Sequence, residues 1–159
     1  MAVTKAKKEE ILKGLEDKFS KAKSVYFADY RGLTVKDLSD LRRKLKENNV
    51  DYVVAKKTLM KISVKNVKLP EIPDYVMEGP VGAAFAYDDE ISAVKTLSEF
   101  KKQAESLQIL GGLVEGRYVS KEEAAQLAAL PSKEELLAKL VGSMKSPISG
   151  FHGVLSGVL

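Results

Sequence analysis

The sequence predicts an α+β protein, with a ferredoxin-like split β-α-β sheet, extra helices and a C-terminal helical extension. Apolar runs of strand length alternate with segments whose apolar residues recur every three or four positions, as they do on one face of a helix. With one extra helix set aside, the order is strand, helix, strand, strand, helix, strand. A sheet of this plan is antiparallel, and we expect its helices on one face.

The first half of the chain supplies two helices and two strands. Helical spacing of apolar residues predicts a helix over 5–22, and the aromatic run at 24–30 predicts a central strand. Thr34 and Asp37 have the spacing of a capping box, which begins the next helix. The segment DYVVA at 51–55 is predicted to be the second strand.

A Lys-rich segment and a strand of small residues come next. Lys57, Lys61 and Lys65 are four residues apart, so they share one face if this segment is helical. The three prolines and one glycine at 69–80 predict a connection. The run GAAFAY at 82–87 predicts a strand that another chain segment approaches closely.

The second half is predicted to complete the sheet and then to become helical. Two Asp residues at 88–89 favour the start of a helix, and 107–114 is the fourth strand. Ser and Glu form capping boxes at 120–123 and 132–135. The apolar residues at 136–144 predict a buried helix face.

The C-terminal segment 147–159 carries a narrow apolar seam at helical spacing. The sequence therefore predicts a domain over 1–146 and the start of a docking helix, which we expect to be incomplete, over 147–159. Folding back onto the domain is an equally open alternative. Three glycines weaken this helix, so we expect it to gain order on binding. The predicted anchors for a partner helix are Ile148, Phe151, Leu155 and Val158.

Charge is distributed unevenly along the chain. Residues 1–68 contain 18 Lys and Arg against nine Asp and Glu, whereas residues 69–159 contain eight against 13. Clustered positive charge is typical of proteins that bind the phosphates of nucleic acid. The alternative is that the Lys-rich helices are merely solvated.

The chain lacks the residues that most classes of enzyme need for catalysis. The chain has no Cys and a single His, His152, which excludes thiolate chemistry, most metal sites and His-based triads. Catalysis by carboxylates stays open, although no pattern indicates it, and we expect no cofactor. No apolar run is long enough to span a bilayer and the N-terminus does not resemble a secretion signal, so we expect a cytoplasmic protein without a membrane partner.

Four segments in this order resemble the family of large-subunit ribosomal stalk-base proteins. They are FADYRGLTVKDLSDLRRKLKENNVDYVVAKKTL, EGPVGAAFAYDD, LGGLVEG and LPSKEELLAKLVGSMKSPISG. The family usually has Lys-Asn-Thr-Leu after the second strand, where this chain has Lys56-Lys57-Thr58-Leu59. Family members also usually continue as a long C-terminal helix, and this chain is expected to end near the beginning of that helix.

The resemblance implies a structural ribosomal protein without catalysis. Its N-terminal domain would bind folded large-subunit ribosomal RNA beside a neighbouring ribosomal protein. Its C-terminal helix would anchor acidic stalk-protein dimers, which recruit GTPase translation factors. The alternative is a free RNA-binding assembly factor or translational regulator of the same fold.

Recognition of folded RNA relies mainly on shape and phosphate, so the RNA-binding candidates are basic and small residues. Gly32 would allow close approach of RNA, or it is simply a turn glycine. The candidates are Lys7, Lys8, Arg31, Gly32, Arg42, Arg43, Lys56, Lys57, Thr58 and Lys61.

Overall fold

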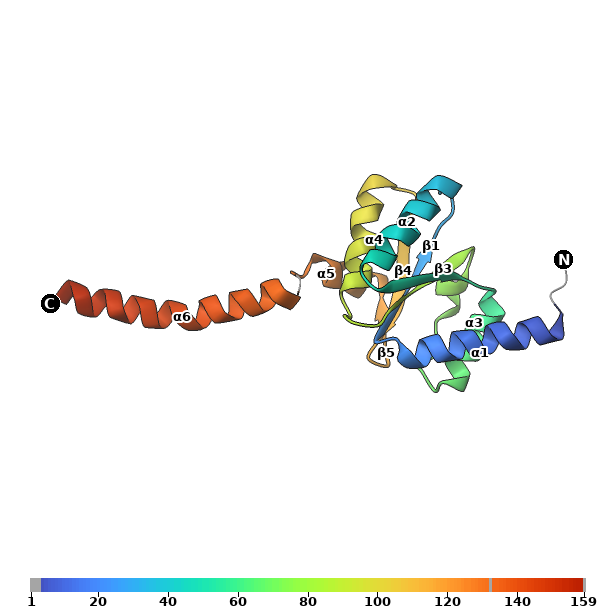
Figure 1. Ribbon diagram of the computed structural model, residues 1–159, viewed down its shortest axis with the longest axis horizontal. Coiled ribbons are helices and arrows are strands. Elements are labelled where there is room, and N and C mark those ends of the chain that lie inside the picture. Colours follow the sequence, from blue (N-terminus) through green and yellow to red (C-terminus); the bar gives the residue numbers. More distant parts are fainter. Residues whose placement is uncertain (1–3, 132, 159) are drawn as a thin grey trace. The chain divides into compact units, whose positions relative to one another are not determined.

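The computed structural model describes residues 4–131 and 133–158. The chain divides into two compact units, residues 1–129 and residues 130–159. Figure 1 follows the chain through both.

The first unit contains a five-stranded sheet with the order β2-β3-β1-β4-β5, in which all neighbours are antiparallel. β3 lies between β1 and β2, and β1 lies between β3 and β4, so the predicted split β-α-β plan is confirmed. The strands are β1 (Ser24–Asp29), β2 (Val50–Val54), β3 (Val81–Ala86), β4 (Gln108–Val114) and β5 (Arg117–Ser120).

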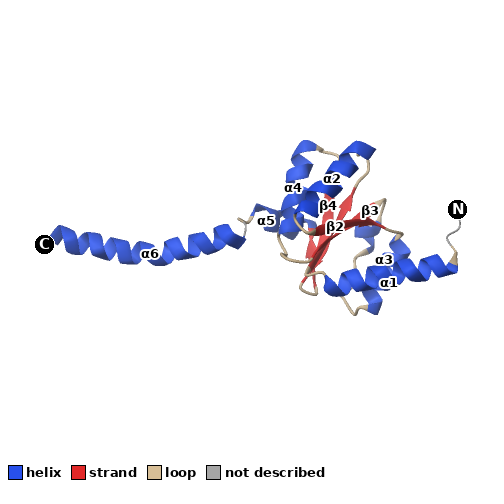
Figure 2. Ribbon diagram, viewed as in Figure 1, coloured by secondary structure: helices blue, strands red, loops and turns tan. Residues whose placement is uncertain are grey.

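Helices cover both faces of this sheet (Figures 1 and 2). One face carries α2 (Val35–Glu47), α4 (Ser92–Gln103) and α5 (Lys121–Ala129). The other carries α1 (Lys5–Lys21), α3 (Lys57–Asn66) and the 3₁₀ helix η1 (Asp74–Met77). The expectation of helices on one face is therefore wrong. Every residue of β1 and β3 is buried, and strands of that kind need cover on both sides.

Each face has its own apolar core. Tyr26 of β1 packs in the core that includes Leu41 and Leu97 from α2 and α4. On the opposite face, the ring of Phe19 from α1 meets Phe85 of β3 edge to face, with the ring centroids 5.0 Å apart. Each such side chain contributes about 1.5–3 kcal/mol by its burial, so the two cores hold the helices on the sheet.

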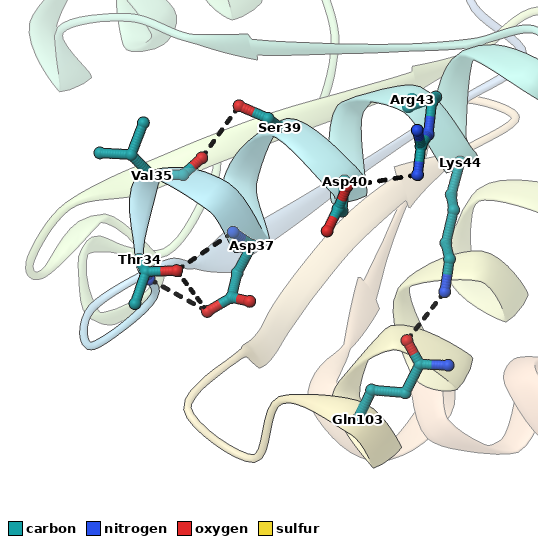
Figure 3. A network of polar contacts seen from close by, with 8 residues as sticks. All are labelled: Thr34, Val35, Asp37, Ser39, Asp40, Arg43, Lys44 and Gln103. Carbon is teal, nitrogen blue, oxygen red and sulfur yellow. Dashed lines mark hydrogen bonds and ion pairs between the residues drawn. The ribbon is translucent and has the colours of Figure 1, made fainter.

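Two of the predicted capping boxes are present. The Thr34 hydroxyl accepts a hydrogen bond from the Asp37 backbone N–H, and the Asp37 carboxylate accepts one from the Thr34 N–H, both at 3.2 Å (Figure 3). Ser120 and Glu123 make the same reciprocal pair before α5. The third predicted box depends on Ser132, which lies outside the described residues.

β5 was not predicted. It forms a hairpin with β4 through a two-residue turn at Glu115 and Gly116, whose φ angles are 49° and 74°. Positive φ at both central residues is the geometry of the tight turn that hairpins prefer. The strand has four residues, which are too few for an alternating pattern of apolar and polar side chains to be recognised. The turn before it is the feature from which the sequence could have predicted the hairpin.

Close packing in the sheet requires glycine at several positions, among them Gly82 and Gly112. A Cβ at Gly82 of β3 would lie 2.1 Å from the Tyr52 hydroxyl, which confirms the predicted close approach at this strand. A Cβ at Gly112 of β4 would lie 2.5 Å from the backbone carbonyl oxygen of Val25. The second contact involves main chain in the middle of the sheet, so it cannot be relieved by turning a side chain.

In its described residues, the second unit contains a single long helix, α6 (Lys133–Val158), of 26 residues. At 1.5 Å per residue it is about 39 Å long. The expected boundary between 146 and 147 lies inside this helix. Pro147 has no backbone N–H to donate to the helix, but the turns on either side of it are helical. The helix α6 continues as far as Val158. The expected gain of order on binding stays a prediction.

The apolar residues at 136–144 are exposed, so the expectation that they form a buried helix face is wrong. Their exposed fractions run from 39% at Leu136 to 67% at Met144. Within the described part of this unit, no other helix or strand is present to cover them. The helical spacing is as predicted, but it does not reveal what the apolar face packs against.

We predict that Gly112→Ala destabilises the first unit by about 1–3 kcal/mol, because the new Cβ overpacks the sheet against the Val25 carbonyl. Urea unfolding followed by circular dichroism measures the change. Gly14→Ala in α1 is the matched control, because a Cβ there meets nothing within 4 Å and Ala favours a helix by about 1 kcal/mol. Equal midpoints for Gly112→Ala and the unmodified protein would contradict the prediction.

Candidate nucleic-acid interface

The ends of three strands meet around one surface hollow of about 380 Å³. In the antiparallel register, Asp29 at the end of β1 pairs with Val81, and Val54 at the end of β2 pairs with Gly82. The segments that follow β1 and β2 therefore lie beside the one that precedes β3. The residues that line the hollow are Tyr30, Val54, Ala55, Lys56, Lys57, Thr58, Gly79, Pro80 and Val81.

The N-terminus of α3 opens at this hollow. Its N-cap residue Lys56 makes no side-chain capping bond, and its first turn contains no acidic residue. The first backbone N–H groups of a helix have no partner within the helix, and they carry the positive end of its dipole. Together with the ammonium groups of Lys56 and Lys57 and the Thr58 hydroxyl, they favour an anion such as phosphate.

Arg31 is held next to the hollow by Asp29. The Asp29 carboxylate accepts hydrogen bonds from the Arg31 backbone N–H at 2.9 Å and from its Nε at 2.8 Å, and it contacts Nη2 at 2.8 Å. The guanidinium lies against Gly79, where a Cβ would be 2.6 Å from Nη2. Arg31 itself is 65% exposed, so it is oriented by the chain and still open to a ligand.

The ionisation of Asp29 depends on this contact. Burial by itself would raise the pKa of the Asp29 carboxyl, but the hydrogen bonds and the charge of Arg31 outweigh it and hold the pKa below its ordinary value. The carboxylate is thus charged at neutral pH, and the Asp29–Arg31 pair is a fixed part of the loop after β1.

The remaining candidates are spread over other surfaces. Lys8 lines an apolar groove between α1 and β2, and Lys7 is exposed on α1. Lys61 pairs with Asp74 of η1, so part of its charge is already neutralised within the chain. Gly32 has a φ of 81° in the turn after β1, so the turn-glycine interpretation accounts for it without RNA.

Arg42 and Arg43 lie on α2, which covers the opposite face of the sheet from α3. Both side chains are exposed, and Arg43 is 3.3 Å from the Asp40 carboxylate (Figure 3). Farther along the helix, Lys44 donates a hydrogen bond to Gln103 of α4. The two arginines form a second basic surface, on the helical layer opposite α3.

Tyr30, Gly79 and Pro80 line the hollow, although the sequence did not predict them as parts of a site. The EGP motif at 78–80 belongs to a segment that carries the family resemblance, and its glycine by itself indicates a turn. The position of Gly79 beside Arg31 follows from the pairing of β1 with β3, and no local sequence pattern predicts that pairing.

Comparison with known proteins identifies the family. The family model for ribosomal protein L10 matches residues 3–102, and the model for the C-terminal region of ribosomal protein uL10 matches residues 130–155.

The chain belongs to the ribosomal protein L10 family. It is 42% identical to the large ribosomal subunit protein uL10 of Natranaerobius thermophilus over 159 residues, which is all of this chain and 90% of that protein. It is 45% identical, with the same coverage, to the uL10 of Thermoanaerobacter sp. (strain X514). The uL10 of Geobacter metallireducens is 39% identical over 95% of this chain and 87% of its own length.

Family membership makes this L10-family chain a structural protein of the large ribosomal subunit, on the cytoplasmic ribosome of bacteria. The predicted ribosomal identity is confirmed, and at the level of the family the protein is structural rather than enzymatic. Among the described residues no helix has the length and hydrophobicity needed to cross a membrane. Nor does the described part of the chain group three His, Asp or Glu where a metal ion could bind.

The match to the C-terminal family region falls on α6. Leu155, one of the four predicted anchors, is 46% exposed on this helix. The side chains of Ile148, Phe151 and Val158 lie outside what the structure describes. Because α6 is continuous from Lys133, the predicted seam extends back by alternating steps of three and four residues through Met144 and Val141 to Leu137.

We predict that Asp29→Asn lowers the free energy of unfolding by about 1–3 kcal/mol at pH 7, since it removes the charged acceptor that holds Arg31. The folded-state pKa of Asp29 is depressed, so its contribution is present above the unfolded pKa of about 3.9 and is lost as pH falls through the folded pKa. Urea unfolding between pH 7 and pH 2 should therefore show the difference from the unmodified protein shrinking below pH 4.

Asp40→Asn is the control for this measurement. The Asp40 side chain is 40% exposed and pairs with the more exposed Arg43 at 3.3 Å, so its replacement should change stability by less than about 0.5 kcal/mol. A difference for Asp29→Asn that stays constant down to pH 2 would show that ionisation of Asp29 is not involved.

Proposed function

We propose that the first unit binds large-subunit ribosomal RNA and that α6 anchors acidic stalk-protein dimers, so that the chain is the base on which GTPase translation factors are recruited. The observation that carries the RNA part is the hollow lined by Lys56, Lys57 and Thr58 at the uncapped start of α3, with Arg31 held against Gly79 at its side. The names of the relatives, large ribosomal subunit proteins, agree with an RNA context.

The hollow suits the phosphate backbone of a folded RNA. Arg31 presents a planar fork that can bond two phosphate oxygens, and the lysines act as mobile point charges. Three strand ends set the positions of these groups, so little conformational freedom of the main chain is lost on binding. Shape and phosphate spacing, rather than base sequence, would select the RNA.

Lys57 stands where the family usually has Asn, and it is exposed at the first position of α3. A lysine keeps a hydrogen-bond donor at this position and adds a charge, but it cannot accept a hydrogen bond as an amide can. We infer that this chain relies more on phosphate attraction here than an Asn-containing relative does.

The proposal for α6 rests on its uncovered apolar seam. Leu137, Val141, Met144 and Leu155 are all at least 46% exposed, and the spacing of three and four residues continues through Ile148, Phe151 and Val158. Such a seam is typical of a helix that packs against partner helices. A length of about 39 Å offers room for several partner helices in a row.

A neighbouring ribosomal protein at the stalk base is a third proposed partner, which follows from the family alone. The alternative function, a free assembly factor or translational regulator, shares the RNA-binding surface but would not use the seam of α6. Docking of stalk dimers therefore distinguishes the two functions.

We predict that Lys56→Ala combined with Lys57→Ala weakens binding to a large-subunit ribosomal RNA fragment. The slope of log affinity against log salt should become shallower by about 0.7–0.9 for each phosphate that the variant no longer neutralises. Fluorescence anisotropy across a salt series, with a scrambled RNA as reference, provides both the affinity and the slope. The matched control is Lys101→Ala with Lys102→Ala, two exposed lysines of α4 on the opposite face of the sheet.

Arg42→Ala with Arg43→Ala tests whether the second basic surface also contacts RNA. Equal weak binding of the unmodified protein to both RNAs would reduce the basic half of the chain to a solvated surface and contradict the RNA proposal.

We predict that Val141→Asp and Leu155→Asp each weaken docking of purified acidic stalk-protein dimers at least tenfold, because a buried unpaired carboxylate is costly at a helix interface. Native mass spectrometry counts the dimers bound, and calorimetry gives the affinity. Ala138→Asp is the control, since position 138 is exposed and lies off the seam. Undiminished docking by both seam variants would remove α6 as the anchor.

A further inference from the structure

A second surface feature lies beside the candidate RNA site and has a different chemistry. It is an apolar groove of about 420 Å³ between α1, the end of β2 and the start of α3. Ile11 and Val54 are 41% and 40% exposed at its sides, and Leu15 and Leu59 contribute to its wall. Its remaining lining residues are Lys8, Gly14, Lys18, Val53, Ala55 and Lys56.

Positive charge surrounds this groove. All three charged residues that line it are lysines. Lys18 pairs with Asp51 of β2 at 3.5 Å, whereas Lys8 and Lys56 have no carboxylate partner within residues 4–131 and 133–158. An occupant with apolar side chains and negative charges would therefore complement both the wall and the rim.

One side of the groove is an edge strand. β2 ends the strand order of the sheet and pairs only with β3. In the part of the chain that the structure describes, no backbone hydrogen bond from another segment reaches its outer edge. An edge of this kind can accept a further strand, with alternate side chains of that strand directed at the same face.

We propose that this groove binds an extended acidic segment of another protein, which adds to the edge of β2. Its carboxylates would meet Lys8 and Lys56, and its apolar side chains would pack on Ile11, Leu15 and Val54. RNA fits the groove less well, because its wall is aliphatic and contains no aromatic ring for a base to stack on. The binding surface goes beyond the RNA and stalk-dimer functions, although Lys8 and Lys56 are among the RNA candidates too.

Gly14 allows the groove to be blocked without touching those lysines. It lines the groove, and a Cβ built on it meets nothing within 4 Å, so Gly14→Phe can place a ring in the empty space. The matched control is Ser20→Phe, which puts the same ring on an exposed position of α1 outside the groove. Val54→Glu is a second blocking variant, which places a negative charge in the groove to repel the carboxylates of an acidic segment.

The probe is a labelled seven-residue peptide of alternating Glu and Val, and its reference is the same peptide with Lys in place of Glu. We expect the full chain to bind the acidic peptide at least tenfold more tightly than the basic one. Gly14→Phe and Val54→Glu should each weaken that binding at least tenfold, while Ser20→Phe changes it less than twofold. Hydrogen exchange should slow at the backbone amides of β2 when the peptide is bound.

Binding to the ribosomal RNA fragment is measured with the same variants. Unchanged RNA affinity for Gly14→Phe, together with abolished peptide binding, supports the proposal and leaves the RNA function to its own test. Weaker RNA binding without any peptide binding would make the groove part of the RNA surface and overturn the proposal. Self-association of the unmodified protein that Gly14→Phe abolishes would overturn it as well, because the occupant would be a second copy.

Discussion

β1 pairs along its length with β3 on one side and β4 on the other, and both of its faces are buried. The rest of the first unit depends on this arrangement. Burial on both faces requires a helical layer on each side, and the tight pairing allows only glycine where Gly112 meets the Val25 carbonyl. Because β1 and β3 expose no residue, the polar chemistry of the protein is displaced to strand ends and helix surfaces.

That displacement explains where the candidate RNA site lies. The antiparallel register places the ends of β1 and β2 beside the start of β3, so Lys57 and Gly79 line one hollow and Arg31 lies against Gly79, although many residues separate them in sequence. The site combines a rigid base with mobile basic side chains. Asp29 orients Arg31, and the start of α3 adds donors whose positions are set by the helix. This combination suits a ligand that is recognised by the spacing of its phosphates.

The positive charge of residues 1–68 does not act as a single surface. Lys61, Lys18 and Arg43 are each paired with a carboxylate of the same chain, and the exposed arginines of α2 lie on the helical layer opposite α3. Net charge alone therefore overestimates the positive potential that one ligand meets. Lys56 lies between the hollow and the apolar groove and lines both, so two different partners could use adjoining surfaces.

Residues close together in the chain were enough to predict the strands of the split sheet, the capping box at Thr34, the family and the apolar spacing of α6. The packed fold was needed to show that helices cover both faces, that Lys61 pairs with Asp74, and that Arg31 lies against Gly79 of the hollow at which α3 begins. Those outcomes depend on strand register and on the approach of distant segments. Local periodicity indicates that a face is apolar, but its partner is set by the packing of the whole fold.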